Sequence, residues 1–195
     1  MLSKNQQKLI RQLSRKKYRQ ETGLFVAEGE KLVNELLNSG WIADQIYTTV
    51  PLQKTSYTIV DPNVIKKISY MASSSPVLAL FQLPEYNLDD IDIKGFSLVI
   101  DSISDPGNLG TIIRLCDWFG IKNIFCSPNT VDCFNPKVIQ STMGSIARVR
   151  CHYVDLLPVI ENYDSMVYAA TLDGNSHYQE FFTSNGLLVI GNESR

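Results

Sequence analysis

The side chains best placed to do chemistry lie in one stretch, residues 98–120, which reads LVIDSISDPGNLGTIIRLCDWFG. Its apolar start is typical of a β-strand, the turn that follows contains Pro106, Gly107 and Asn108, and the next helix carries Arg114. A strand, a glycine-containing turn and a helix start together present free backbone N–H groups to a ligand. We therefore predict a binding site at this turn, to which Asn108 adds an amide and Arg114 a fixed positive charge.

A purely structural role fits the same residues. Turns between strands and helices commonly contain Asp, Pro, Gly and Asn, so Asn108 could serve as the N-cap of the helix. Arg114 could form a surface ion pair with Asp101 or Asp117. The glycine patterns of dinucleotide and nucleoside-triphosphate sites are missing, which disfavours a dinucleotide-dependent oxidoreductase.

The elements that must position these residues alternate between strand and helix. Such alternation is typical of an α/β domain with a parallel sheet and helices on both faces, where ligands bind beyond the carboxyl ends of the strands. Asn108, Thr171 and Gly191 follow three different predicted strands, so we expect them at one edge of the sheet. The predicted strands are Phe96–Ile100, Asn123–Cys126, Ala147–His152, Met166–Ala170 and Leu187–Ile190, and the predicted helices are Gly110–Phe119, Pro136–Met143, Leu156–Glu161 and Tyr178–Phe182.

A smaller α/β unit precedes this sheet. Residues 1–20 predict a basic helix, and alternating apolar patterns predict strands and helices up to Gln82. The acidic, proline-containing segment that follows reads as a linker. The predicted strands are Phe25–Ala27, Ile42–Thr49, Tyr57–Val60 and Val77–Gln82, and the predicted helices are Gly29–Ser39 and Asn63–Met71.

Two ordered motifs make the interpretation specific. Residues 105–114 (DPGNLGTIIR), with Phe119-Gly120, resemble the first motif of the SpoU/TrmH family, and residues 187–193 (LLVIGNE) resemble its second motif. Residues 25–31 (FVAEGEK) are similar to the start of the family's substrate-binding domain. The family consists of RNA ribose 2′-O-methyltransferases of the knotted SPOUT superfamily, which use S-adenosylmethionine and act as homodimers.

The resemblance implies a role for each site residue. Arg114 is the catalytic residue, while Asn108 and Glu193 hold it and the RNA-facing loop in place. A guanidinium is effectively never deprotonated in proteins, so we expect Arg114 to stabilise the developing alkoxide and the adjacent phosphate rather than act as a base. The positions that line the S-adenosylmethionine pocket are Thr171, Leu172 and Gly191.

The resemblance also implies a division of the chain. Residues 1–83 hold the basic helix and the RNA substrate-binding domain, 84–94 are the linker, and 95–195 form the SpoU-type methyltransferase domain. The family's third motif, which completes the knot, does not occur in the sequence. We therefore interpret the chain as an incomplete family member, with a non-catalytic RNA-binding protein or fragment of the family as the alternative.

The charge distribution favours an RNA partner. The net charge is only −2, yet the first twenty residues contain seven basic residues and no acid. The usual fate of such a run is a solvated helix face, but the complete absence of acids favours phosphate contact. A membrane-surface role is weaker, because the apolar face of this helix lacks aromatic residues. The predicted RNA-binding residues are Lys4, Lys8, Arg11, Arg15, Lys16, Lys17 and Arg19, with ribosomal RNA favoured over transfer RNA.

Composition limits the remaining possibilities. A chain of 195 residues, 44% hydrophobic and 19% charged, is typical of a soluble globular protein with one large or two small domains. No apolar run approaches the ~20 residues of a membrane helix, and the N-terminus does not resemble a secretory signal. Four cysteines without C-x-x-C spacing favour buried thiols in a cytoplasmic protein over a metal site of Cys126, Cys133 and His152.

Overall fold

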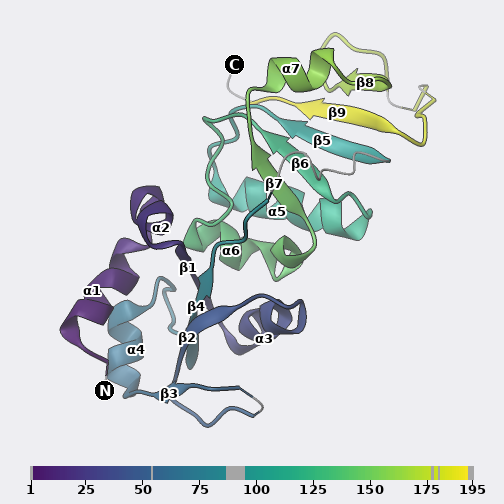
Figure 1. The fold of residues 1–195 in the computed structure, drawn as a ribbon. Coiled ribbons are helices and arrows are strands. Elements are labelled where there is room, and N and C mark those ends of the chain that lie inside the picture. The colour runs from purple at the N-terminus through teal and green to yellow at the C-terminus, as the bar shows by residue number, and fades with distance from the viewer. Residues whose placement is uncertain (1, 54, 87–94, 177, 180, 193–195) are drawn as a thin grey trace. The chain divides into compact units, whose positions relative to one another are not determined.

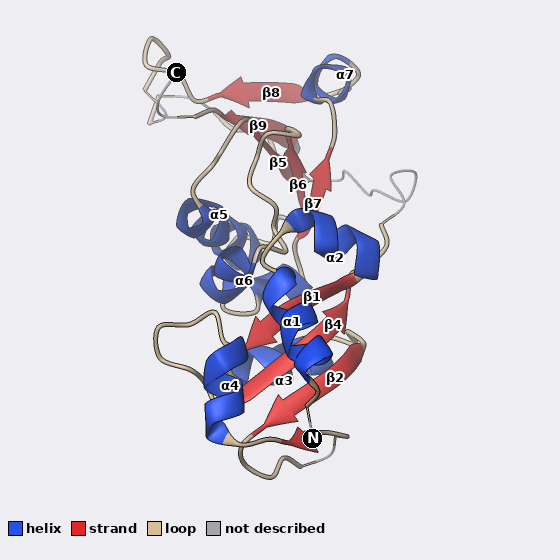
Figure 2. Ribbon diagram, turned by 90° about the vertical axis from the view of Figure 1, so that its left-hand side faces the viewer, coloured by secondary structure: helices blue, strands red, loops and turns tan. Residues whose placement is uncertain are grey.

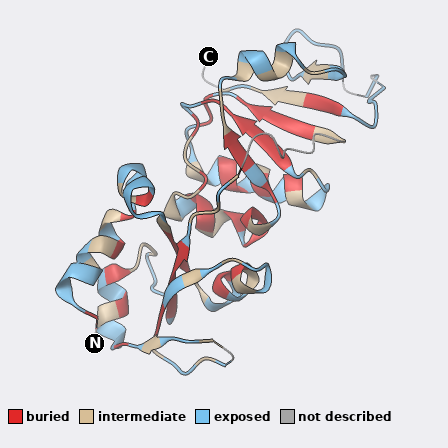
Figure 3. Ribbon diagram, viewed as in Figure 1, coloured by how far each residue is buried: buried red, intermediate tan, exposed pale blue. Residues whose placement is uncertain are grey.

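The computed structural model describes residues 2–53, 55–86, 95–176, 178–179 and 181–192. The chain forms two compact units, Met1–Glu85 with Asp132–Ala147 and Tyr86–Val131 with Arg148–Arg195 (Figure 1). Residues 132–147 thus pack with the N-terminal unit, although they lie far along the chain from it. Each unit is built on its own sheet, and the buried residues gather on the strands (Figure 3).

The sheet of the first unit has the strand order β1-β4-β2-β3. The strand β4 runs antiparallel to both β1 and β2, whereas β3 is parallel to β2. These strands confirm the four predicted in this region. Their bounds are β1 Leu24–Glu28, β2 Ala43–Thr48, β3 Thr58–Ile59 and β4 Val77–Gln82, and the helices are α1 Lys4–Gln12, α2 Lys16–Thr22, α3 Glu30–Asn38, α4 Pro62–Ile68, α6 Pro136–Thr142 and the 3₁₀ turn Ser145–Ala147.

The two faces of this sheet are covered differently. Val26 and Leu80 point to one face, where they join the core formed by α1 and α4. Alternation along a strand sends Phe25 and Phe81 to the opposite face, where Phe25 contacts the rings of Phe81, Trp41 and Phe134. Figure 2 shows the helices that flank the strands of this unit.

The expected single basic helix over residues 1–20 is wrong, because two helices occupy this region. The first, α1, ends at Gln12 with Leu13 as its C-cap, and the backbone of Arg15 is extended before α2 begins. The Nη1 atom of Arg19 donates to the carbonyl oxygen of Leu13 over 2.7 Å. A helix end leaves carbonyls without intrahelical partners, and the buried guanidinium satisfies one of them.

The sheet of the second unit confirms the predicted parallel α/β architecture. Five parallel strands have the order β7-β6-β5-β9-β8. Val99, Phe125 and Leu187 form a core on one face with apolar residues of α7, and α5 lies on the other face (Figure 1). The elements are β5 Phe96–Ile100, α5 Pro106–Trp118, β6 Asn123–Cys126, β7 Arg150–Tyr153, α7 Leu156–Glu161, β8 Met166–Ala169 and β9 Gly186–Ile190.

In the second unit, two predicted boundaries differ from the structure by more than two residues, and one predicted helix is not seen in the described residues. Helix α5 begins at Pro106, four residues before the predicted start, because Asp105 and Pro106 form an N-cap and a first helical residue. Strand β7 begins at Arg150, since the preceding residues form a 3₁₀ turn. The predicted helix Tyr178–Phe182 is absent from the described residues of that segment.

Candidate functional site

The candidate site lies at the carboxyl edge of the parallel sheet. Strands β5, β9 and β8 are neighbours in that order, with Ile100 in register with Ile190, and Val189 with Ala169. The segments that leave these strands therefore begin side by side. They carry Asn108, Gly191 and Thr171 respectively, so the prediction that these three follow different strands at one edge agrees with the sheet topology.

The segment after β5 leads directly into the first turn of α5. The Oδ1 atom of Asp105 accepts the backbone N–H of Asn108 over 2.8 Å, so Asp105 is the N-cap. The suggestion that Asn108 caps the helix is therefore wrong, and its exposed side chain projects from the first turn instead. A Cβ on Gly107 would lie 3.0 Å from that same Oδ1 atom, so the small residue keeps the cap accessible.

Arg114 is exposed on the middle of α5, and in the described part of the chain it has neither an ion pair nor a hydrogen bond. The alternative in which it pairs with Asp117 is wrong, because Asp117 accepts two hydrogen bonds of 2.8 Å from Arg148. Asn108 and Arg114 are six residues apart, which separates them by about 9 Å along the helix and about 120° around it. Arg114 is thus a free cation, and it is not held by Asn108.

Sequence reasoning missed a clamp around Ser102, which adopts a left-handed backbone with φ of 57°. Its N–H donates to the buried Oγ of Ser127 over 2.8 Å, and its carbonyl accepts the side-chain amide of Asn192 over 2.9 Å. The Ser127 hydroxyl also contacts Thr130. These contacts tie the segment after β5 to those after β6 and β9. Only Asn192, inside the second motif, could have been noticed in the sequence.

The predicted cofactor residues lie at the same edge. Thr171 and Leu172 are exposed just beyond β8, and Gly191 follows β9. A Cβ added to Gly191 would meet no other atom within 4 Å, so the described structure leaves open space beside its backbone. Glu193, the third predicted catalytic residue, lies outside the described residues.

The predicted RNA-binding residues separate into two groups. Six of the seven are exposed: Lys4, Lys8, Arg11, Arg15, Lys16 and Lys17. Arg19 is the exception, and its assignment to the RNA surface is wrong. Its side chain is 2% exposed and forms an ion pair with Asp132, with an Nε–Oδ2 distance of 3.1 Å. The buried guanidinium of Arg19, bound by a carboxylate and a backbone carbonyl, stabilises the fold and is not available to RNA.

The buried titratable groups of the second unit act in packing. Burial and the nearby charge of Arg150 lower the pKa of His152, whose Nε2 lies 3.1 Å from Oδ1 of Asn123. Burial, with a smaller effect of Cys126, raises the pKa of Cys116 to about 12, so this thiol is unreactive. The described residues contain no group of three or more potential ligands that could hold a metal ion. None of the described helices could cross a membrane.

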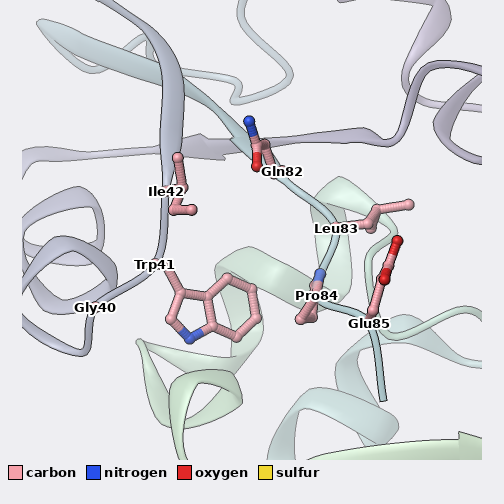
Figure 4. A pocket seen from close by; sticks show the side chains of 7 residues that line it. All are labelled: Gly40, Trp41, Ile42, Gln82, Leu83, Pro84 and Glu85. Carbon is pink, nitrogen blue, oxygen red and sulfur yellow. The ribbon is translucent and has the colours of Figure 1, made fainter. Parts of the chain in front are cut away.

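A pocket in the first unit lies beside the indole of Trp41. Figure 4 shows the ring with Pro84 nearby, and Ile42, Gln82 and Glu85 are among the other residues that line the pocket. The Trp41 ring is held edge-on against Phe25, with centroids 5.6 Å apart. None of the predicted site residues lines this pocket.

Comparison with known proteins identifies the family. The SpoU rRNA Methylase family model matches residues 95–195, and the model of the MRM3-like substrate binding domain matches residues 4–79. A 23S rRNA guanosine 2′-O-methyltransferase of Bacillus subtilis is 30% identical, over 98% of this chain and 81% of its own length. The mitochondrial rRNA methyltransferase 3 of Xenopus laevis is 28% identical over 76% of this chain, which spans only 38% of that longer protein.

Solved structures agree with the sequence comparisons. A TrmH-family protein from Porphyromonas gingivalis superposes with a TM-score of 0.88 at 33% identity, over 100% of this chain and 82% of its own. An rRNA methyltransferase from Sinorhizobium meliloti with AdoMet bound gives a TM-score of 0.86 at 28% identity, over 99% of this chain and 80% of its own. The resemblance seen in the two motifs is therefore confirmed over both units, and the chain belongs to the SpoU rRNA methylase family.

Proposed function

We propose that this protein transfers a methyl group from S-adenosylmethionine to a ribose 2′-hydroxyl of RNA, with ribosomal RNA as the substrate. One observation carries the proposal: the guanidinium of Arg114, unpaired within the described structure, lies on the helix that follows β5, and β5, β9 and β8 end side by side. These strands belong to the part of the chain that matches the SpoU methylase family model. The relatives named above are rRNA methyltransferases, and one of the solved relatives binds AdoMet. These relatives support the substrate class and the methyl donor.

The residues at the sheet edge fit the methyl donor. The open space beside Gly191 permits close approach of a ligand to the backbone. The exposed residues Thr171 and Leu172 follow β8, the strand that pairs with β9. We assign these three residues to the cofactor. S-adenosylmethionine, when bound, supplies an activated methyl group on sulfur.

We assign catalysis to Arg114, supported by Asn108 and Glu193. As the 2′-hydroxyl loses its proton to phosphate or water, negative charge develops on its oxygen, and the guanidinium of Arg114 stabilises this charge and the neighbouring phosphate. Asn108 presents its exposed side chain from the first turn of α5, just beyond the carboxyl end of β5. Since the reaction needs aligned reactants, these groups act chiefly by positioning and by charge.

The cellular context and assembly belong to the same proposal. We propose a cytoplasmic protein, because all four cysteines are buried and are not joined in disulfides. We propose a homodimer, supported by exposed apolar side chains at the C-terminal end of α5, where Trp118 is 82% and its neighbour Phe119 73% exposed. We also propose that RNA binds through residues 1–83, with a linker over 84–94 and catalysis in 95–195. Sedimentation of the chain tests the dimer.

Methyl transfer to ribosomal RNA by the chain, with calorimetry of S-adenosylmethionine binding, tests the function. Arg114→Lys is the decisive variant, because a point charge does not reproduce the planar fork of a guanidinium. We expect a loss of about 10²-fold or more in turnover with unchanged affinity for S-adenosylmethionine. The matched control is Arg148→Lys, an arginine of the same unit that Asp117 holds at the surface. Near-full turnover of Arg114→Lys would refute its role, and RNA binding without cofactor binding would favour a non-catalytic family member.

A further inference from the structure

A groove of about 530 Å³ runs along α1 and reaches across to α4. Four cations of the N-terminal segment line it, Lys4, Lys8, Arg11 and Arg15, and α4 contributes a fifth, Lys67. The remaining lining side chains are glutamines and a serine, so none of the described residues that line the groove is an acid. Lys16 and Lys17, although exposed, do not belong to it. The groove thus combines Lys67 with cations that lie 52 to 63 positions earlier in the sequence.

The two walls of the groove are held together by the core. Ile10 and Leu13 from the first wall and Ile65 and Ile68 from the second are each 1% exposed or less, and they share one apolar cluster. The Tyr70 hydroxyl, just beyond α4, donates to the carbonyl oxygen of Ile10. The backbones that carry the cations are therefore held at fixed mutual positions. Ligand binding then loses less conformational entropy than it would if the two helices first had to be brought together.

Within the described residues, the groove cations have no acidic partner, in contrast to two cations of the neighbouring helix α2. Lys17 pairs with Glu21 at 3.8 Å, and Arg19 pairs with Asp132. In the described part of the chain, none of the five groove cations forms an ion pair. Like charges gathered on one surface repel each other and destabilise the compact state. An external polyanion would relieve this repulsion, so the arrangement points to a ligand.

We propose that this groove binds the sugar–phosphate backbone of the RNA substrate. The inference rests on the proposed function for the identity of the polyanion. Because lysine and arginine neutralise phosphates and release counterions, such binding is independent of base sequence and depends strongly on salt. Lys67 distinguishes this proposal from RNA binding by the N-terminal helices alone, because it is the groove cation that comes from α4.

The test measures binding of a short fluorescein-labelled RNA hairpin by anisotropy over a range of salt concentrations. Each phosphate contact contributes a slope of about −0.7 to −0.9 in a plot of log K against log salt. Lys67→Ala should therefore reduce the magnitude of the slope by that amount and weaken binding about five- to eightfold at 0.1 M salt. Lys8→Ala should act alike, and the effects of the two should multiply.

The matched control is Lys66→Ala, which removes the same charge from the adjacent exposed position of α4, outside the groove. Its slope should equal that of the unmodified chain. Equal losses of RNA affinity in Lys66→Ala and Lys67→Ala would overturn the proposal, because they would indicate nonspecific electrostatic attraction rather than a phosphate-binding site. Loss of binding to phosphatidylserine vesicles with unchanged RNA binding would overturn it as well, in favour of a membrane.

The experiments distinguish refutation of the groove proposal from refutation of the proposed methyltransferase function. Calorimetry with S-adenosylmethionine should give the same affinity for Lys67→Ala as for the unmodified chain. If the chain methylates RNA but the groove variants bind the hairpin normally, the groove proposal is wrong and the function stands. If the groove variants lose hairpin binding but the chain neither binds S-adenosylmethionine nor methylates RNA, the function is wrong and the groove stands.

Discussion

The buried pair of Arg19 and Asp132 predicts a large and specific loss of stability in Asp132→Ala. The guanidinium is 2% exposed and donates to Oδ2 of Asp132 through both Nε and Nη2. Oδ1 of the same carboxylate accepts the N–H of Phe134 over 3.0 Å. Truncation therefore leaves a buried cation without its counter-charge. Breaking a buried pair from one side costs about 3–5 kcal/mol, and the surviving bond to Leu13 places the loss near the lower end, about 3 kcal/mol.

Urea unfolding followed by tryptophan fluorescence measures this loss. Trp118 is replaced by Phe in all variants, since it is 82% exposed and its removal leaves Trp41 as the reporter of the first unit. With an m-value of about 2 kcal/mol per molar urea, a loss of 3 kcal/mol lowers the midpoint by about 1.5 M. The control Lys17→Ala removes the exposed pair with Glu21 on the same helix and should cost only about 0.3–0.5 kcal/mol.

A double-mutant cycle gives the sharper result. In an Arg19→Met background no buried charge remains to be stranded, so Asp132→Ala should cost much less than it does alone. If Asp132→Ala shifts the midpoint no further than Lys17→Ala does, or costs the same in both backgrounds, the reasoning from burial is refuted. RNA binding at moderate salt should be unchanged in Arg19→Met once its lower stability is allowed for.

Two further predictions concern the second unit. Because the fold lowers the pKa of His152, the unfolded chain takes up a proton at a higher pH than the folded chain. The contribution of His152 to the unfolding free energy should therefore be constant between about pH 7 and 8, fall as the pH drops below 6.5, and level off below the lowered pKa. Unfolding midpoints between pH 5 and 8 check this, and His152→Gln should flatten the dependence. At Ser102, φ of 57° favours glycine, so Ser102→Gly should be neutral or stabilising by up to about 1 kcal/mol, whereas Ser102→Val should lose about 1–3 kcal/mol. Equal midpoints of these two variants would contradict the argument from strain.

The candidate site shows which structural features local sequence patterns predict and which they do not. Strand periodicity and turn residues placed Asn108, Thr171 and Gly191 at the carboxyl ends of strands, since hydrophobic period and turn chemistry are local properties. The same local rules misjudged the start of α5. Asp105 and Pro106 are turn formers and also an N-cap with its first helical residue, and only the hydrogen bond to Asn108 distinguishes the two roles.

The environment of the charged residues could not be predicted from local sequence patterns. All seven cations of the first twenty residues look equivalent in the sequence, but Arg19 is neutralised by Asp132, which lies 113 residues away. Lys67 gave no sequence signal, and it joins the basic groove because the core packs α4 against α1. Whether a charged side chain faces water or a partner depends on burial, which is a property of the whole packed unit.

The amino-acid sequence by itself determined the architecture of the second unit, the two family motifs and the unusual charge of the N-terminus, because each is written in residues that are close together along the chain. Only the tertiary structure decided which cations remain free, where Ser102 is clamped and which strands lie side by side. These depend on pairings between distant segments, since the energy of a buried contact is set by neighbours in space.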